Sequence, residues 1–208
     1  MRITRYEDMD DTAKDMMREI GSIGTGNAAT ALSSLLKTGV EMTVPKVEIL
    51  GYNEAVDLLG HPEDMISGVL VQMTGDVSGV MLFLMKMDFI NEVLQCVLQE
   101  SIDGYEQMGE MEVSAATEVG NIIISSYILS LSKLADMDIS LSVPAFSVNM
   151  LGGIMTVPMA EFGYVSDKLM MITGKCIIGG RNVDSNLLLL PDIQSLNYLM
   201  DRLVTPYE

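Results

Sequence analysis

The chain has 208 residues, of which 49% are hydrophobic and 20% are charged, a composition typical of a compact globular protein rather than a disordered one. Its 12 basic residues stand against 29 acidic ones, so the formal net charge is −17. A surface this acidic repels nucleic-acid phosphates and anionic lipids, and we therefore expect neither nucleic acid nor a membrane among the partners.

The N-terminal sequence MRITRYEDMDD is charged and lacks the apolar core of a secretory signal. The most apolar stretch, residues 68–87, is interrupted by Gln72, Gly75, Asp76 and Gly79, which favours two strands around a turn over a membrane span. We therefore expect a cytoplasmic protein without a transmembrane helix.

Cysteine and histidine, which often carry chemistry, are scarce. Cys96 and Cys176 form no CxxC pair, so we expect reduced buried thiols rather than metal ligands or a redox couple. The single histidine, His61, lies in the turn-like sequence GHPED, far from any serine or cysteine nucleophile motif. Zinc chemistry, thiol catalysis and a histidine-based triad are therefore disfavoured.

The first long segment with helical periodicity extends from about Asp10 to Lys37, with Gly39 as a plausible C-cap. Three glycines, at positions 21, 24 and 26, lie inside it. Each weakens a helix interior by up to about 1 kcal/mol relative to alanine, so they indicate a bend or a close crossing with another backbone.

The rest of the first half alternates strands with helices. A strand-like stretch at 40–50 contains Pro45, and a short helix is predicted at 53–59. Strands at 66–73 and 77–85 follow, and Asp88 is expected to cap a helix that reaches about Gln99.

The same order recurs after an acidic connector at 100–112. The predicted elements are a long helix at 112–135, a strand at 137–148 containing Pro144, a helical stretch at 151–162, strands at 169–177 and 186–190, and a helix from Asp192 to about Leu203. We interpret this as an internal duplication within one domain, with halves at 1–103 and 104–208. The expected fold class is α+β, with two pseudo-symmetric α/β halves and a largely antiparallel sheet flanked by long helices.

Two copies of one polar pattern lie in register, 99 positions apart. Each has three residues on one helix face, at i, i+4 and i+7, and a proline after 22 further residues. A single polar stripe is usually only the solvated face of a helix, but its recurrence with the proline favours a function. The copies are Asp15, Glu19, Ser22 and Pro45, and Ser114, Glu118, Asn121 and Pro144.

These patterns, D-x3-E-x2-S-x22-P and S-x3-E-x2-N-x22-P, together with GSIGTGNAATALSSLL, resemble the CheC/CheX/FliY family of chemotaxis phosphatases over nearly the whole chain. The presence of two copies of the pattern within about two hundred residues is similar to the CheC type of this family. The resemblance implies hydrolysis of the aspartyl phosphate on a CheY-like response regulator. It places Asn121 as the group that orients the attacking water and Glu118 as the anchor for the regulator.

The resemblance also bears on the other pattern residues. Glu19 matches the family in the first half, but Ser22 replaces the family's asparagine, so we expect this first site to be weak or silent, because a hydroxyl is shorter than an amide. Ser114, Asp15, Pro45 and Pro144 have supporting roles. The resemblance implies a CheD-like receptor deamidase as a second partner, no cofactor of the chain's own, and magnesium supplied by the regulator.

Two other interpretations remain open. The first is a non-catalytic module that binds and sequesters the phosphorylated regulator or a CheD-like deamidase. The second takes the glycines of GSIGTGN as a phosphate-cradling loop for a nucleotide, although no Gly-Lys-Ser/Thr follows them and no clear strand precedes them.

Overall fold

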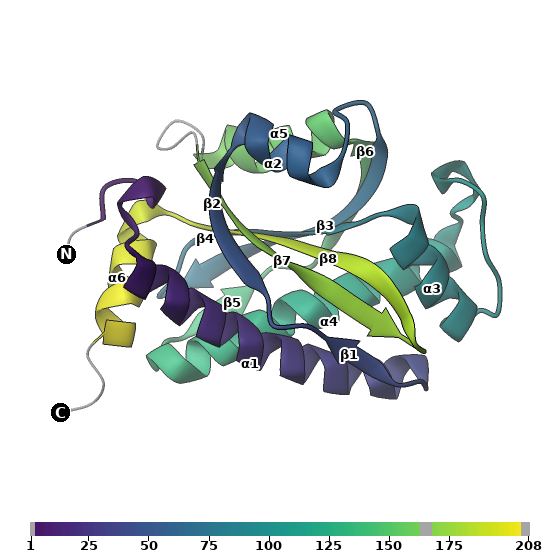
Figure 1. Ribbon diagram of the computed structural model, residues 1–208, viewed down its shortest axis with the longest axis horizontal. Helices are drawn as coiled ribbons and strands as arrows, with labels where there is room; N and C mark the ends of the chain where they lie inside the picture. Colours follow the sequence, from purple (N-terminus) through teal and green to yellow (C-terminus); the bar gives the residue numbers. More distant parts are fainter. Residues whose placement is uncertain (1–2, 163–167, 205–208) are drawn as a thin grey trace.

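The structure is a computed structural model that describes residues 3–162 and 168–204. Within these residues the predicted α+β class is confirmed, because one antiparallel eight-stranded sheet lies between two layers of helices (Figure 1). The long helices α1 (Asp11–Leu36) and α4 (Glu110–Ala135) lie side by side on one face. The short helices α2 (Tyr52–Leu59) and α5 (Leu151–Phe162) lie on the other.

The two halves follow the same element order. Besides α1 and α2, the first half contains the 3-10 turn η1 (Tyr6–Asp8), β1 (Val40–Met42), β2 (Lys46–Gly51), β3 (Met65–Gly75), β4 (Gly79–Met85) and α3 (Met87–Val97). Besides α4 and α5, the second contains η2 (Tyr105–Gln107), β5 (Ile139–Leu141), β6 (Ala145–Met150), β7 (Lys168–Ile178), β8 (Arg181–Pro191) and α6 (Ile193–Val204).

The two strands expected at 40–50 and 137–148 are each divided into a pair. Pro45 lies in the break between β1 and β2, and Pro144 lies in the break between β5 and β6. Proline has no backbone N–H to donate to a strand ladder, so it marks the place where each strand bends away.

Of the three predicted helix caps, one is confirmed and two are wrong. Asp192 caps α6 as predicted, since its carboxylate accepts a 2.7 Å hydrogen bond from a backbone N–H in the first turn. Asp88 does not cap α3, whose N-cap residue is Lys86; Asp88 lies in the first turn, where its charge favours the helix dipole. Lys37, rather than Gly39, closes α1 in the left-handed conformation, with a φ of 53°.

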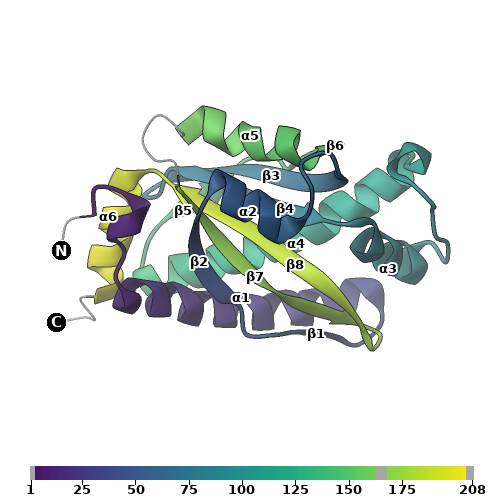
Figure 2. The same cartoon turned by 45° about the horizontal axis from the view of Figure 1, so that its top comes forward.

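The sheet is built by exchanging edge strands between the halves. Its order is β1-β7-β8-β4-β3-β5, with β2 also paired to β7 and β6 also paired to β3. The short strands of each half therefore extend the long hairpin of the other half, while β4 and β8 pair at the centre. Figure 2 shows β2 lying along β7, far from it in sequence. Neither half contains a complete sheet by itself.

A second repeated motif becomes visible in the structure. The sequences YEDMD at 6–10 and YEQMG at 105–109 form η1 and η2, 99 positions apart. In both, the tyrosine hydroxyl donates to a backbone oxygen at the end of a sheet strand: Tyr6 to Pro191 and Tyr105 to Met85, the latter at 3.1 Å. The acidic connector is thus anchored to the sheet.

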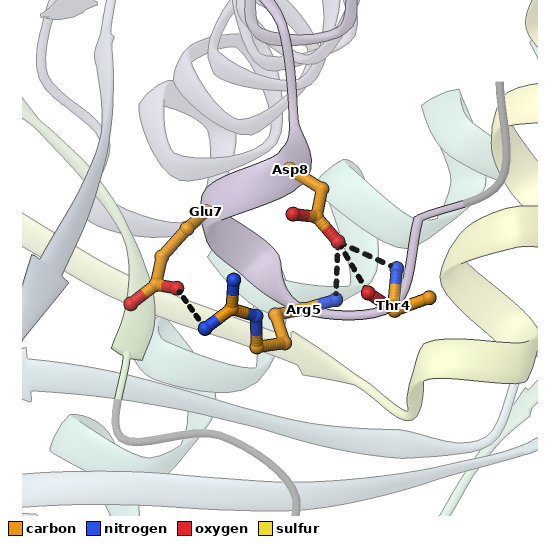
Figure 3. A network of polar contacts seen from close by, with 4 residues as sticks. All are labelled: Thr4, Arg5, Glu7 and Asp8. Atoms are coloured by element: carbon orange, nitrogen blue, oxygen red, sulfur yellow. Dashed lines mark hydrogen bonds and ion pairs between the residues drawn. The ribbon is translucent and has the colours of Figure 1, made fainter.

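The turn η1 is fixed by a polar network around one carboxylate (Figure 3). Asp8 accepts hydrogen bonds from the backbone N–H of Thr4 at 2.8 Å, the Thr4 hydroxyl at 2.6 Å and the Arg5 N–H at 2.9 Å. These bonds, the Thr4 hydroxyl first, lower the pKa of Asp8. Asn197 of α6 exchanges two more with the backbone of Ile3, so the N-terminal segment is held against α6.

Glycines allow the long helices to approach closely. A Cβ at Gly24 would lie 3.1 Å from the Cα of Tyr127, so here α1 crosses the backbone of α4, as the sequence indicated. A Cβ at Gly120 would lie 2.6 Å from Val69 Cγ2, which places α4 directly on β3. Gly26, by contrast, has nothing within 4 Å of such a Cβ.

We predict that Gly120→Ala destabilises the protein by about 1–3 kcal/mol, because the added methyl group overlaps the β-branched side chain of Val69 in the core. The matched variant Gly26→Ala adds the same methyl group in open space and should stabilise α1 by up to about 1 kcal/mol. Urea unfolding of both variants measures the difference, and equal midpoints would contradict the close packing of α4 on β3.

Candidate functional site

Each long helix carries one of the two polar stripes, as predicted. On α4, Ser114 and Glu118 are exposed and Asn121 is half-buried. The hydroxyl of Ser125, one turn later, donates to Asn121 Oδ1 at 3.4 Å. In the described part of the chain, Nδ2 of Asn121 donates to no other group, so the amide has one long contact and has donors available.

The stripe on α1 has the same form but different chemistry. Asp15 and Glu19 are exposed and Ser22 is half-buried, like its counterpart Asn121 in the second pattern. Asp15 pairs with Arg18 at 3.0 Å, an exposed pair of little energetic weight. The first site therefore presents two carboxylates and one hydroxyl, without an amide.

The two stripes form separate sites. The helices α1 and α4 lie antiparallel (Figure 1), and their backbones meet where a Cβ at Gly24 would lie 3.1 Å from the Cα of Tyr127. Glu19 comes 5 positions before Gly24, and Glu118 comes 9 positions before Tyr127. Because the helices run in opposite directions, at a rise of 1.5 Å per residue the two glutamates are about 20 Å apart along the helix pair.

The two prolines of the patterns have different environments. Pro45 is buried and packs on α1 beside the first stripe, since a Cβ at Gly21 would lie 2.9 Å from Pro45 Cγ. Pro144 is half-buried, and the glycine before Asn121 packs on β3 instead. Pro45 thus supports the helix position next to Ser22 directly, which gives a packing reason for its fixed spacing.

An apolar groove adjoins the second stripe. It has a volume of about 430 Å³ and lies between the end of α1, the end of α3 and the first turns of α4. Three large apolar side chains in it are exposed: Leu35 by 38%, Val97 by 42% and Met111 by 64%. Ser114 and Glu118 form part of its wall, so polar stripe and apolar groove are one continuous surface.

The corresponding hollow at the start of α1 has a different lining, which includes three aspartates. The residue 99 positions before Met111 is Thr12, and the hollow beside it, of about 200 Å³, is lined by Ile3, Asp8, Asp10, Ala13, Met200 and Asp201. The N-terminal segment of Figure 3 supplies part of this lining. The duplicated backbone therefore carries an apolar surface at one end of the helix pair and an acidic one at the other.

The structure rules out the nucleotide-loop interpretation. The sequence GSIGTGN is helical throughout and lies inside α1, so its backbone N–H groups belong to the helix and cannot cradle a phosphate. The glycines serve helix packing instead, since Gly21 and Gly24 touch Pro45 and Tyr127.

The thiols are free, as predicted, although Cys96 is half-buried and only Cys176 is fully buried. Burial raises the pKa of Cys176 to about 12 and also raises that of Cys96, so both remain protonated near neutral pH. Among the described residues, no three His, Cys, Asp or Glu side chains gather as a metal-binding group. None of the helices in residues 3–162 and 168–204 is long and apolar enough to span a membrane.

The sequence analysis missed two features of this surface. Ser125 follows Asn121 by one helical turn, and its spacing was a usable signal for a supporting hydrogen bond. The apolar groove was not visible, because Leu35, Val97 and Met111 come from three helices and read as ordinary core positions in each.

Two protein-family models match separate parts of the chain, one in each long helix region. A model of the CheC-like family matches residues 13–49, and a model of the chemotaxis phosphatase CheX matches residues 67–160. The CheY-P phosphatase CheC of Bacillus subtilis (strain 168) is 28% identical over 189 residues, which are 89% of this chain and 90% of that protein.

Solved structures share the fold. FliY of Thermotoga maritima aligns with a TM-score of 0.75 at 22% identity, over 95% of this chain and 98% of that one. A chain from the CheX-CheY-BeF3-Mg²⁺ complex of Borrelia burgdorferi aligns with a TM-score of 0.50 at 20% identity, over 80% of this chain and 95% of that one.

We predict that the apolar groove contributes little to folding. Met111→Ser should change the free energy of unfolding by about 0.5 kcal/mol or less, because the side chain is 64% exposed. Met17→Ser, at a position in α1 that is 1% exposed, should cost several kcal/mol, about 2–5. Chemical denaturation of both variants tests this, and a large loss for Met111→Ser would show that the groove is part of the core.

Proposed function

The chain belongs to the CheC/CheX/FliY family, and from that membership we propose that it is a cytoplasmic phosphatase that hydrolyses the aspartyl phosphate of a CheY-like chemotaxis response regulator. The observation that carries the proposal is the intact stripe on α4, where exposed Glu118 and the amide of Asn121 lie one turn apart. The relative named CheY-P phosphatase CheC, similar over 89% of this chain, supports the same reaction.

The proposed reaction needs few catalytic groups from this protein. An aspartyl phosphate is a reactive mixed anhydride, and its hydrolysis needs mainly a water in line with phosphorus and neutralised charge on the transferring group. Asn121 inserts its amide beside the phosphate and orients the water, because an amide both donates and accepts hydrogen bonds. The Ser125 hydroxyl lies 3.4 Å from Asn121 Oδ1, a long contact that leaves the amide free to turn toward the phosphate and the water.

Glu118 anchors the regulator. Among the described residues it forms no ion pair, and it is exposed, so its carboxylate is available to a lysine or arginine beside the partner's phosphorylation site. Ser114, one turn earlier, extends the polar contact. The magnesium ion that neutralises the phosphoryl group comes bound to the regulator in this scheme.

The groove gives the second site a docking surface that the first lacks. Its exposed apolar side chains continue directly from Glu118, so a regulator that pairs with Glu118 also covers Met111 and Leu35. At the first site, Ser22 replaces the amide and Thr12 replaces the apolar residue. We therefore assign catalysis to the second site and a weak or silent role to Glu19, with Asp15 and Pro45 supporting only the local structure.

Two further parts of the proposal rest on family membership. The first is that a CheD-like receptor deamidase is the second partner. The alternative function, a non-catalytic module that sequesters the phosphorylated regulator or the deamidase, is favoured by one observation, the loss of the amide at Ser22. Asn121 argues against it, because sequestration needs no group that orients water.

The main test is decay of the aspartyl phosphate on a purified CheY-like regulator with magnesium present. Wild-type protein should accelerate decay, and Asn121→Ala should lower the catalysed rate by about 10²–10³-fold, as loss of one transition-state group does. Asn27→Ala is the matched control, since it removes an exposed asparagine from α1 whose side chain, among the described residues, bonds only to Ser130. Unchanged decay with persistent binding would establish the sequestering module instead.

Glu118→Ala should act on binding more than on the chemical step, raising KM about tenfold or more through loss of a charge-assisted pair. Glu19→Ala should leave the rate within about twofold of the unmodified protein, because the second site remains intact. A comparable loss from Glu19→Ala would move catalysis to the first site and contradict the assignment.

We predict that Ser22→Asn does not make the first site equal to the second. The substitution restores the amide but not the apolar groove, so the total rate should rise by less than about twofold at limiting regulator concentration. Steady-state phosphate release by Ser22→Asn/Asn121→Ala isolates the first site. A rate equal to that of the unmodified protein would show that the amide alone decides activity.

A further inference from the structure

A second cleft lies on the opposite face of the sheet, where α2 and α5 pack (Figure 1). It has a volume of about 310 Å³, at the lower end of the size of small-molecule sites. Its floor is a row of cross-strand neighbours: Lys46 on β2 faces Thr173 on β7, which faces Asn186 on β8. This face is separate from the stripes on α1 and α4, so the cleft is independent of the proposed phosphatase site.

The cleft concentrates positive charge in a strongly acidic protein. Three of the 12 basic residues line it, Lys46, Lys86 and Lys175, although the net charge of the chain is −17. Lys175 pairs with Asp184 beside it. Among the described residues, Lys46 and Lys86 form no ion pair, so two ammonium groups face the cleft without a compensating carboxylate.

The second feature of the cleft, besides its unpaired lysines, is the buried side chain of Asn186. It is only 8% exposed, lies at the centre of the sheet between Thr173 and Leu84, and lines the cleft. Its side chain hydrogen-bonds to no residue that the structure describes. A central strand position of this kind usually holds an apolar side chain. Among the described residues no fully buried side-chain nitrogen or oxygen lacks a partner, so the unpaired amide atoms of Asn186 must reach the solvent of the cleft, where a ligand can bind them.

The chemistry of the lining favours a phosphoryl group. The donors are ammonium groups, the Thr173 hydroxyl and the Asn186 amide, and no arginine lies among the lining residues. Lysine is a common phosphate ligand that binds as a point charge, whereas arginine would give bidentate recognition of carboxylate and phosphate alike. Val44 and Leu58 form an exposed apolar rim, 66% and 51% exposed, that fits an uncharged part of the same ligand.

The cleft is lined by residues of both halves, but the position that corresponds to Lys46 in the second half carries no charge. The residue 99 positions after Lys46 is Ala145, which cannot bind an anion. We propose that the cleft over β2, β7 and β8 binds a small phosphoryl-bearing ligand through Lys46, Lys86, Thr173 and Asn186.

Calorimetric titration with inorganic pyrophosphate tests this assignment. The unmodified protein should bind it saturably, more weakly as salt rises, and Lys46→Gln/Lys86→Gln should weaken binding at least tenfold. The control Lys14→Gln/Lys133→Gln makes the same change of charge outside the cleft and should alter affinity less than twofold. Asn186→Leu, which leaves the charge unchanged, should weaken binding by a further measurable factor of about three or more.

Two outcomes would overturn the proposal. One is no saturable binding by the folded wild-type protein, or equal affinity in the lysine pair and its control. The other is citrate binding as tightly as pyrophosphate, which would show a site for anions in general rather than for phosphoryl groups. Thermal unfolding of each variant confirms that the fold is retained, because the substituted lysines lie at the surface or the margin of the cleft.

Discussion

The close approach of α1, α4 and the sheet is the constraint on which the arrangement of this molecule depends. At Gly24 the backbone of α1 reaches Tyr127, and at Gly120 the backbone of α4 reaches Val69. Larger residues would separate these layers, since packed interiors leave little room for an added methyl group. With the buried faces fixed in this way, the residues that follow Gly21 and Gly120, Ser22 and Asn121, must lie on the outer border of the helix pair.

The exchange of edge strands gives this arrangement its rigidity. The strands β1 and β2 pair with β7, and β5 and β6 pair with β3, so each long helix is connected to strands that belong to the other half's hairpin. An opening of one half would break backbone hydrogen bonds in both. The helix pair therefore rests on a sheet whose two hairpins are tied together by strands of the opposite half, which suits a surface that must present an amide in a fixed position to a partner.

The long helices and the polar stripes could be predicted from the sequence, each from a specific local signal. The long helices have clear ends at Asp10 and Asp136, and the polar stripes stand out because their spacing recurs with a proline. Strand partners could not be predicted, since an alternating pattern shows which face is buried but not which strand lies alongside. Leu35 and Met111 could not be recognised as neighbours for the same reason, because a surface formed by three helices leaves no local pattern.

The duplication itself explains how the two halves differ. Their elements follow the same order, and from α1 to β2 they correspond to α4 to β6 at an offset of 99, yet Ser22 stands against Asn121, Thr12 against Met111, and Lys46 against Ala145. Each difference alters a surface without altering an element, because the shared core already holds both helices in place. A duplicated fold of this kind needs only one working copy of each surface, so each half can lose one that the other retains. The amide of Asn121 lies on α4 beside the apolar groove, whereas the lysine cleft is formed by strands of both halves, so the halves differ in the surfaces around them as well as at single positions.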